Sequence, residues 1–414
     1  MSDIREGLTL LKRREFAQLF VAYLISYTGT AMAPIAMAFG VLELTGSTKA
    51  SSIVIAAPIA AQIVMLLLGG VLADRTSRQK MLVLADLMSM AMQLTIAYLF
   101  LSGQATVPTL LGLMLVNGIA FALGTPAAMG FIPQIVDRAD LQSANALLGV
   151  ARNSAMMMGA ALAGILVATV GPGWTLALDG LSFGVSALLI VTLRPKAQAA
   201  TDEATLFEDL RLGWQAFIGQ KWLWTIVLQF SLIVAAIEAV FGLIGPAVAK
   251  SQLGGAVAWG MISAGFGLGT LIGGLVGIRL NPKRPMLFAT YCTLSFCLVP
   301  LGLSVPLAVG VLALLAVIQG IAGQMFAVLW YTTLQKMIAA NMLSRVSAYD
   351  HLGSIALAPL GIVIGGYLYE SIGSQDTLLI AAATVLLPTF LIFMVRDVRE
   401  LTSQQVEQRA ALHG

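Results

Sequence analysis

Between two long apolar runs, the sequence reads Gly69-Gly70-Val71-Leu72-Ala73-Asp74-Arg75-Thr76-Ser77-Arg78-Gln79-Lys80. Its last seven residues include four charged side chains. A charge at the centre of a bilayer costs about 2.5–3.5 kcal/mol even on lenient insertion scales. The stretch therefore has to lie outside the hydrocarbon, as a short turn between two membrane-spanning helices. It predicts an all-α integral membrane protein.

The composition supports the same class. Of the 414 residues, 58% are hydrophobic and 10% are charged, with a mean hydropathy of +0.91, whereas a soluble domain has about 25% charged residues. The apolar runs have the length of spanning helices and not of barrel strands. The cations lie in the gaps between these runs, so the net charge of +3 does not indicate a nucleic-acid partner. Cys292 and Cys297 point about 140° apart on a helix, so no disulfide, metal site or cofactor is predicted.

The sequence contains twelve apolar runs that are separated by charged residues or by glycine and proline, and these runs predict twelve transmembrane helices. They cover approximately residues 16–40, 51–73, 81–101, 107–128, 144–170, 174–193, 222–249, 257–280, 286–303, 305–331, 347–369 and 377–395. The one long polar interruption contains a predicted amphipathic helix on the membrane face, at 205–217. We therefore expect a six-helix N-terminal bundle at 1–193, a cytoplasmic linker at 194–221, and a six-helix C-terminal bundle with a tail at 222–414.

Lysine and arginine set the predicted orientation. With an even number of helices, both termini share one side, which collects 21 of the 23 cations, and the other side has only Lys49 and Lys250. By the positive-inside rule, both termini are cytoplasmic. The first apolar run is too long for a signal-peptide core and is interpreted as a retained helix.

The two halves also repeat. A shift of 204 residues, close to half the chain, places Gly69, Gly70, Arg75 and Lys80 on Gly273, Gly274, Arg279 and Arg284. Pseudo-symmetric halves of six helices around a central pathway describe one large class of transporters.

The charged stretch resembles the loop between helices 2 and 3 of the major facilitator superfamily, which reads G-x-x-x-D-R-x-G-R-R. The matching residues are Gly70, Asp74, Arg75, Arg78 and Lys80, and Ser77 replaces a glycine. The resemblance implies a conformational switch in which this loop locks the cytoplasmic faces of the two halves together and then releases them. From their positions near the cytoplasmic side, Asp86 and Arg152 are assigned to the same ion network, where Arg152 either snorkels or pairs with Asp86 or Asp140.

Further segments are similar to the drug:proton antiporter branch of that superfamily, which includes macrolide-efflux and enterobactin-exporter-like proteins. Gly159-Ala160-x-x-Ala163-Gly164 is a degenerate form of the exporter signature G-P-x-x-G-G. The resemblance implies that this segment seals the outer end of an exporter. The alternative interpretation is that these small residues allow neighbouring helices to pack closely. We adopt it for Gly159, Gly164, Pro359, Gly361 and Gly365.

Charged side chains inside the spans are costly and therefore usually functional. Glu238 lies among apolar neighbours, well away from either end of the seventh predicted helix, and is the first candidate for proton coupling. Asp179, about one turn into the sixth helix, is the second, although the helix dipole also favours an acid there. For both, the alternative is a structural carboxyl bonded to a neighbouring helix.

Candidate substrate-binding residues begin with Tyr23, Tyr27 and Thr30, which share one face of the first helix. In the superfamily, helices 1, 4, 7 and 10 line the central pathway. The resemblance therefore implies further substrate contacts at Asn117, Phe121, Glu238, Phe241, Gln319, Phe326 and Trp330. The alternative for each is an interhelical hydrogen bond or a packing contact.

These patterns together predict a monomeric, multi-pass transporter of the inner membrane that exchanges protons for amphiphilic small molecules, drug-like or siderophore-like, by alternating access. Multidrug efflux and antibiotic resistance would follow from such an activity. A phosphate-binding G-x-x-x-x-G-K-[ST] loop is absent, and His351 and His413 are the only histidines, so neither an ATP-driven pump nor an enzyme is expected. A proton-coupled importer and a sensor of the same fold remain as alternatives.

Overall fold

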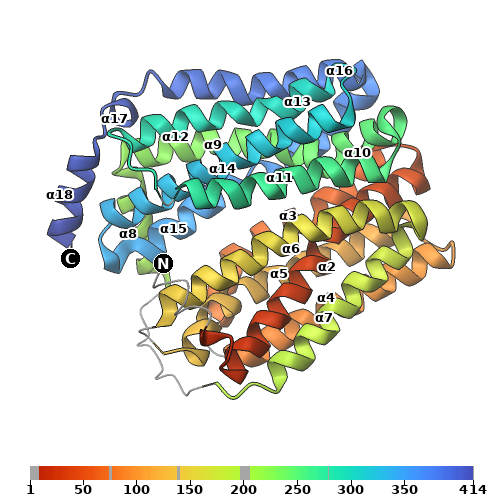
Figure 1. The fold of residues 1–414 in the computed structure, drawn as a ribbon, viewed down its shortest axis with the longest axis horizontal. Coiled ribbons are helices and arrows are strands. Elements are labelled where there is room, and N and C mark those ends of the chain that lie inside the picture. The colour runs from red at the N-terminus through yellow and green to blue at the C-terminus, as the bar shows by residue number, and fades with distance from the viewer. Residues whose placement is uncertain (1–8, 74–76, 138–139, 196–205, 278, 414) are drawn as a thin grey trace. The chain divides into compact units, whose positions relative to one another are not determined.

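The computed structural model describes residues 9–73, 77–137, 140–195, 206–277 and 279–413. These ranges form helices and short turns, without strands (Figure 1). The long helices before residue 201 are α2 (Arg14–Thr45), α3 (Thr48–Ala73), α4 (Arg78–Leu101), α5 (Val107–Ile135), α6 (Leu141–Thr169) and α7 (Gly171–Val191). Later helices are α8 (Leu206–Ile218), α9 (Lys221–Ala239), α10 (Gly245–Val248), α11 (Ala256–Gly277), α12 (Pro285–Thr293), α13 (Leu298–Leu303), α14 (Val309–Met337), α15 (Ala340–Ile355), α16 (Ala358–Ile392), α17 (Arg396–Arg399) and α18 (Ser403–His413).

Eleven helical segments within the described ranges are long and apolar enough to cross a membrane. The last of them, Arg345–Ile392, covers the region where two spans were predicted. Gly373, inside α16, has φ 86° and ψ 172°, so the helical backbone is interrupted there. Glycine adopts a positive φ without the steric cost of a Cβ. The multi-pass helical class is confirmed, and the count of twelve helices stays a prediction.

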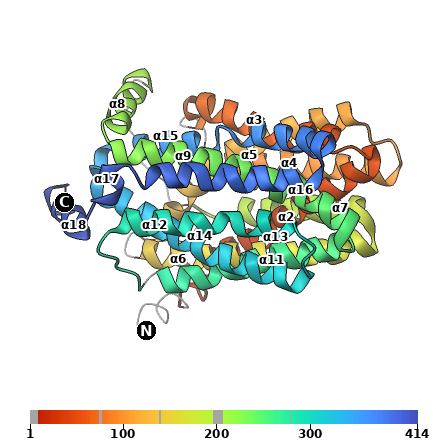
Figure 2. The same cartoon turned by 90° about the horizontal axis from the view of Figure 1, so that it is seen from above.

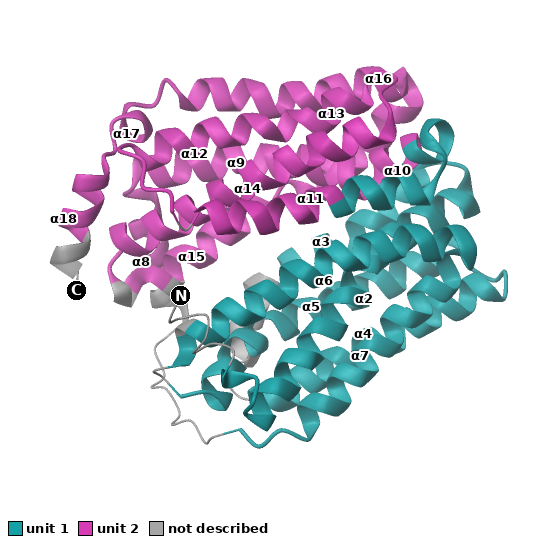
Figure 3. Cartoon of the chain, viewed as in Figure 1, with its two compact units in different colours: residues 1–201, 249–264 teal, residues 202–248, 265–414 magenta. Residues whose placement is uncertain are grey.

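The chain divides into two compact units (Figure 3). Unit 1 consists of residues 1–201 and 249–264, and unit 2 consists of residues 202–248 and 265–414. The main division falls inside the segment 194–221 that was predicted as a linker. The exception is 249–264, which was expected in the second bundle and groups with unit 1. The two bundles of six helices therefore stay a prediction.

Unit 1 is built from closely packed helix pairs. α2 lies against α6 and α7, α4 lies against α5 and α7, and α3 lies against α5. A Cβ on Gly118 of α5 would lie 2.7 Å from the Cα of Pro58 in α3, so only a glycine permits this approach. Phe16, Leu19 and Phe131 are fully buried in the core.

In unit 2, α9 packs against α16 (Figure 2), and α12 packs against α14. A Cβ on Gly361 of α16 would lie 2.8 Å from the Cα of Ala235 in α9. Between α12 and α13 the chain forms a short 3₁₀ helix, η4 (Leu294–Cys297). The pairing of α9 with α16 fixes the helix that carries Glu238.

The helix α8 confirms that the polar interruption contains a helix, and part of its apolar side packs against α15. Phe217 is buried, and its ring centroid lies 6.0 Å from that of Tyr349 in α15. Trp214 stacks on Phe217 at 5.9 Å and is about half exposed. Phe217 is therefore covered by α15, and the placement of α8 on the membrane face stays a prediction.

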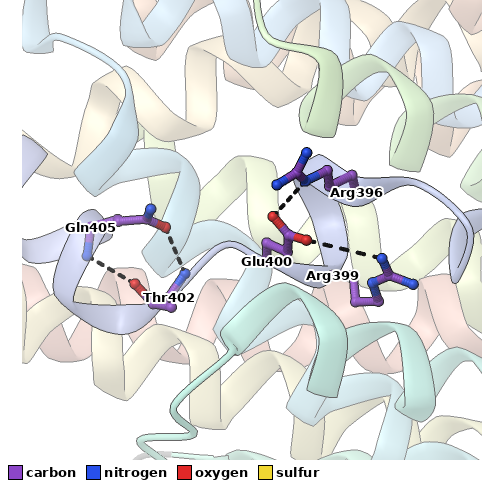
Figure 4. Close-up of polar contacts among 5 residues, drawn as sticks. All are labelled: Arg396, Arg399, Glu400, Thr402 and Gln405. Carbon is purple, nitrogen blue, oxygen red and sulfur yellow. Dashed lines mark hydrogen bonds and ion pairs between the residues drawn. The ribbon is translucent and has the colours of Figure 1, made fainter.

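The C-terminal segment is held by polar contacts (Figure 4). Arg396 Nε donates to Glu400 Oε2 at 2.7 Å, which lowers the pKa of the Glu400 carboxyl. Thr402 and Gln405 bond each other's backbone N–H across the start of α18. The backbone N–H of Ser403 donates to the Lys283 carbonyl at 3.0 Å and joins α18 to the loop before α12.

Candidate functional site

A cavity of about 100 Å³ lies inside unit 1, between α2, α4, α5 and α7. Tyr23, Tyr27 and Thr30 contribute to its wall from α2, and Phe121 contributes from α5. The spacing of four and three residues turns the α2 side chains to one side of the helix. The structure thus brings together four of the residues predicted to bind substrate.

Asp86 also lies in the wall of this cavity. The Ser186 hydroxyl of α7 is hydrogen-bonded to its carboxyl, and its Oδ2 is buried without a hydrogen-bond partner. This environment differs from the predicted cytoplasmic ion network with Lys80 or Arg152. The reason is geometric: Asp86 lies on the side of α4 that meets α7, whereas Lys80 and Arg152 are exposed.

The charged loop can be followed only in part. Asp74 and Arg75 lie outside the described residues, and Gly70 lies in the last turn of α3. The Arg78 guanidinium packs so closely on Gly130 of α5 that a Cβ there would overlap it. The switch role of the loop stays a prediction, and Gly130 is a contact that the sequence analysis missed.

A second acidic side chain, Asp179, is buried in unit 1, two helical turns before Ser186 on α7. Asp179 of α7 has no exposed surface, and Gln93 Nε2 of α4 donates to its Oδ2 at 2.6 Å. Asp179 Oδ1 and Gln93 Oε1 are both buried without hydrogen-bond partners. A single proton on the carboxyl would supply the donor that these two oxygens lack, as in a carboxylic acid bonded to an amide.

Room for the Asp179 side chain comes from Gly29 of α2. A Cβ at Gly29 would lie 2.6 Å from Asp179 Oδ1 and would overlap the Ser182 hydroxyl. The sequence analysis missed both Gly29 and Gln93. A usable signal was the seven-residue spacing from Asp86 to Gln93 and from Asp179 to Ser186, which places polar side chains two turns apart on each helix.

Replacing Gln93 with alanine is expected to lower the unfolding midpoint of the detergent-purified protein. The substitution leaves the Asp179 carboxyl buried without its amide donor, and such a loss costs about 1–3 kcal/mol. Gln104→Ala, at an exposed position after α4, serves as the matched control. Equal midpoints for the two variants would show that the Gln93–Asp179 bond contributes nothing to stability.

Glu238 lies in the last turn of α9 and is half-buried. A π-helix, η2 (Val240–Ile244), begins two residues later, and a second one, η3 (Ala249–Leu253), follows α10. π-Helical turns are rare and frequently mark functional positions. Phe241 packs on Phe266 with the ring centroids 5.3 Å apart. The backbone that follows Glu238 is thus irregular.

Other predicted substrate residues lie inside the packed core. Gln319 accepts a hydrogen bond from the backbone N–H of Val299 at 3.2 Å, and Trp330 donates to Asp350 at 3.1 Å. Phe326 stacks on Phe230 with the centroids 4.8 Å apart. Each of these three side chains is at most 5% exposed, which favours the packing alternative for them. Asn117 is likewise buried, at 4% exposure, and does not line the cavity.

Backbone or side-chain atoms of a neighbouring helical segment lie close to each of the four glycines assigned to packing. A Cβ on Gly159 of α6 would lie 2.7 Å from Ala31 Cβ in α2, and one on Gly164 would lie 2.8 Å from the Ala256 carbonyl oxygen in α11. On α16, Gly361 approaches Ala235, and Gly365 approaches Ala239 and Ile244. Pro359 lies in the first turn of α16, where its missing N–H costs no helical hydrogen bond.

A family model described as "Transmembrane secretion effector" matches residues 6–414. The chain belongs to this family. Transmembrane secretion effectors of this kind are major facilitator transporters, so the resemblance stated from the sequence is confirmed. The chain is therefore a multi-pass membrane transporter.

Named relatives of this secretion effector include enterobactin exporters. Those of Salmonella typhi and of Escherichia coli O81 (strain ED1a) are each 26% identical to it, and the matches cover 86% of this chain and 88% of each relative.

Solved structures show the same fold. A nucleoside transporter, NupG, superimposes with a TM-score of 0.74 at 13% identity, covering 94% of this chain and 100% of that one. A D-xylose-proton symporter gives a TM-score of 0.71 at 12% identity, with coverages of 94% and 98%.

Proposed function

We propose that this transporter exports amphiphilic small molecules, siderophore-like or drug-like, in exchange for protons. It would work as a monomer in the inner membrane, with both termini cytoplasmic. Support for export comes from the family description and from the relatives named as enterobactin exporters. If drugs are among its cargo, the activity would confer multidrug efflux and antibiotic resistance.

The observation that carries proton exchange is the placement of acids inside the spans. Asp179 is fully buried, and its partner Gln93 is neutral, so the carboxyl can take up a proton without breaking an ion pair. Glu238 lies at the junction of α9 with a π-helix, where a change in its charge would act on irregular backbone. We propose that proton binding and release at Glu238 drive the transport cycle and that Asp179 is a second proton-binding site.

In the proposed cycle, the loop residues Asp74, Arg75 and Arg78 bias which end of the pathway is closed. Cargo binds next to the first helix, at Tyr23, Tyr27 and Thr30, and proton uptake resets the transporter. Glu238 contributes from α9 and Phe241 from η2.

Everted membrane vesicles test this function. When the vesicle interior is more acidic than the medium, so that protons leave the lumen as cargo enters, vesicles that contain the protein are expected to accumulate a cargo compound from a panel of antibiotics, dyes and siderophores, and a protonophore is expected to abolish the accumulation. Vesicles from a deletion strain provide the control. If no compound accumulates, and proton-driven uptake occurs instead in right-side-out vesicles, the protein is an importer. Failure in both orientations would favour a sensor.

A further inference from the structure

We infer that the unit 1 cavity is a subsite for a small ammonium group on the cargo, bound by Asp86 and the aromatic rings beside it. The inference rests on the proposed transport function and names the class of molecule that the transporter would select. Asp86 thereby becomes a specificity-determining residue in place of a member of the cytoplasmic ion network.

The charge of the cavity wall favours a cation. Asp86 Oδ2 is buried without a hydrogen-bond partner, so one strong acceptor remains available. Among the described residues that line the cavity, none is lysine, arginine or histidine. An anionic group would therefore meet a carboxylate with no compensating cation, whereas an ammonium group would supply the missing donor.

Aromatic rings surround the same space. Tyr23 and Tyr27 form an edge-to-face pair with the centroids 5.8 Å apart, and Phe121 and Phe183 form another at 6.2 Å. All four side chains line the cavity. The faces of aromatic rings attract cations, and quaternary ammonium groups are recognised by such cages. A carboxylate together with several rings is a combination suited to an amine.

The volume limits what can enter. About 100 Å³ is well below the roughly 300–1,000 Å³ of sites that enclose a drug-sized ligand. The cavity can hold one substituted ammonium group but not an entire amphiphile. Tyr27 and Thr30 are half-buried and Thr125 is exposed, so the cavity reaches the surface of unit 1, where the remainder of the molecule can lie.

The small probe hexyltrimethylammonium tests the inference by thermal unfolding of the full-length protein in detergent. It is expected to raise the unfolding midpoint in a saturable way, and hexanoate at the same concentration is expected to have no effect. Asp86→Asn is expected to raise the concentration needed for half of the shift at least tenfold. Asp376→Asn removes an exposed acid in α16 and is expected to respond like the unchanged protein. An equal response to hexanoate, or an unchanged response of Asp86→Asn, would overturn the inference.

A second measurement needs no variant. Dicyclohexylcarbodiimide modifies carboxyl groups in apolar surroundings, and mass spectrometry of peptides can quantify its reaction at each acid. Hexyltrimethylammonium is expected to slow labelling of Asp86 at least fivefold and to leave labelling of Asp179, which does not line the cavity, unchanged. Equal protection of both acids, or of neither, would contradict the site. Neither measurement depends on transport, so loss of proton-driven export in vesicles would overturn only the proposed function.

Discussion

The Gly164→Leu variant is expected to fold and reach the membrane but to lose proton-driven export. A Cβ at this position would lie 2.8 Å from the Ala256 carbonyl oxygen and 3.0 Å from Gly260 Cα, so α6 and the start of α11 would have to separate. Overpacking of this kind costs about 1–3 kcal/mol. If the contact forms in only one state of the cycle, the same energy shifts the balance between states about 5- to 150-fold.

Gly149 offers a matched control on the same helix. A Cβ there would meet no atom within 4 Å, so Gly149→Leu is expected to export normally. The measurements are accumulation in everted vesicles and the amount of monodisperse protein after gel filtration. Normal export by Gly164→Leu would show that the α6–α11 contact does not need to stay closed. Loss of folded protein would show that Gly164 is required for folding itself.

Substitution of Glu238 by glutamine is expected to reduce proton-driven accumulation at least tenfold. Glutamine has nearly the same shape as a protonated glutamate, so packing at the end of α9 is preserved while the group can no longer bind or release a proton. Exchange of labelled for unlabelled cargo without a gradient is expected to continue, because that half of the cycle does not require the proton.

Glu43→Gln is the control for this variant, since Glu43 is an exposed acid in the last turns of α2. Full proton-dependent accumulation by Glu238→Gln would rule out Glu238 as the driving group. In that event Asp179→Asn is the next variant to measure, because Asp179 is the second proton site in the proposed mechanism.

Much of the fold could be predicted from the sequence because lipid imposes simple length and charge rules. The expected span at 107–128 corresponds to α5, and the polar interruption at 194–221 does contain a helix. These rules do not predict features that depend on how distant segments of the chain pack together. The grouping of 249–264 with unit 1 depends on packing between distant segments, which hydropathy does not register. By contrast, the polar residues between 369 and 377 did indicate a break, and the helical backbone is interrupted there, at Gly373.

For the candidate site, the sequence predicted the placement of some residues but not of others. Periodicity was sufficient for Tyr23, Tyr27 and Thr30, which do share a cavity wall. It does not decide the role of Phe326 and Trp330, which are buried, because an aromatic stripe on a helix looks the same whether it faces a pathway or a core. Sequence proximity to Lys80 placed Asp86 in an ion network, which stays a prediction, and the structure adds that the rotation of α4 turns Asp86 toward α7. Only the packed structure could supply that rotation.

Gly29 limits how relatives of this chain can vary. The Asp179 carboxyl occupies the space that any side chain at position 29 would need, so the two positions cannot change independently. A natural sequence with alanine or a larger residue at 29 must also make room at both Ser182 and the acid at 179. In a family alignment, this dependence would appear as covariation between α2 and α7, and it would separate relatives that retain the buried acid from those that have lost it.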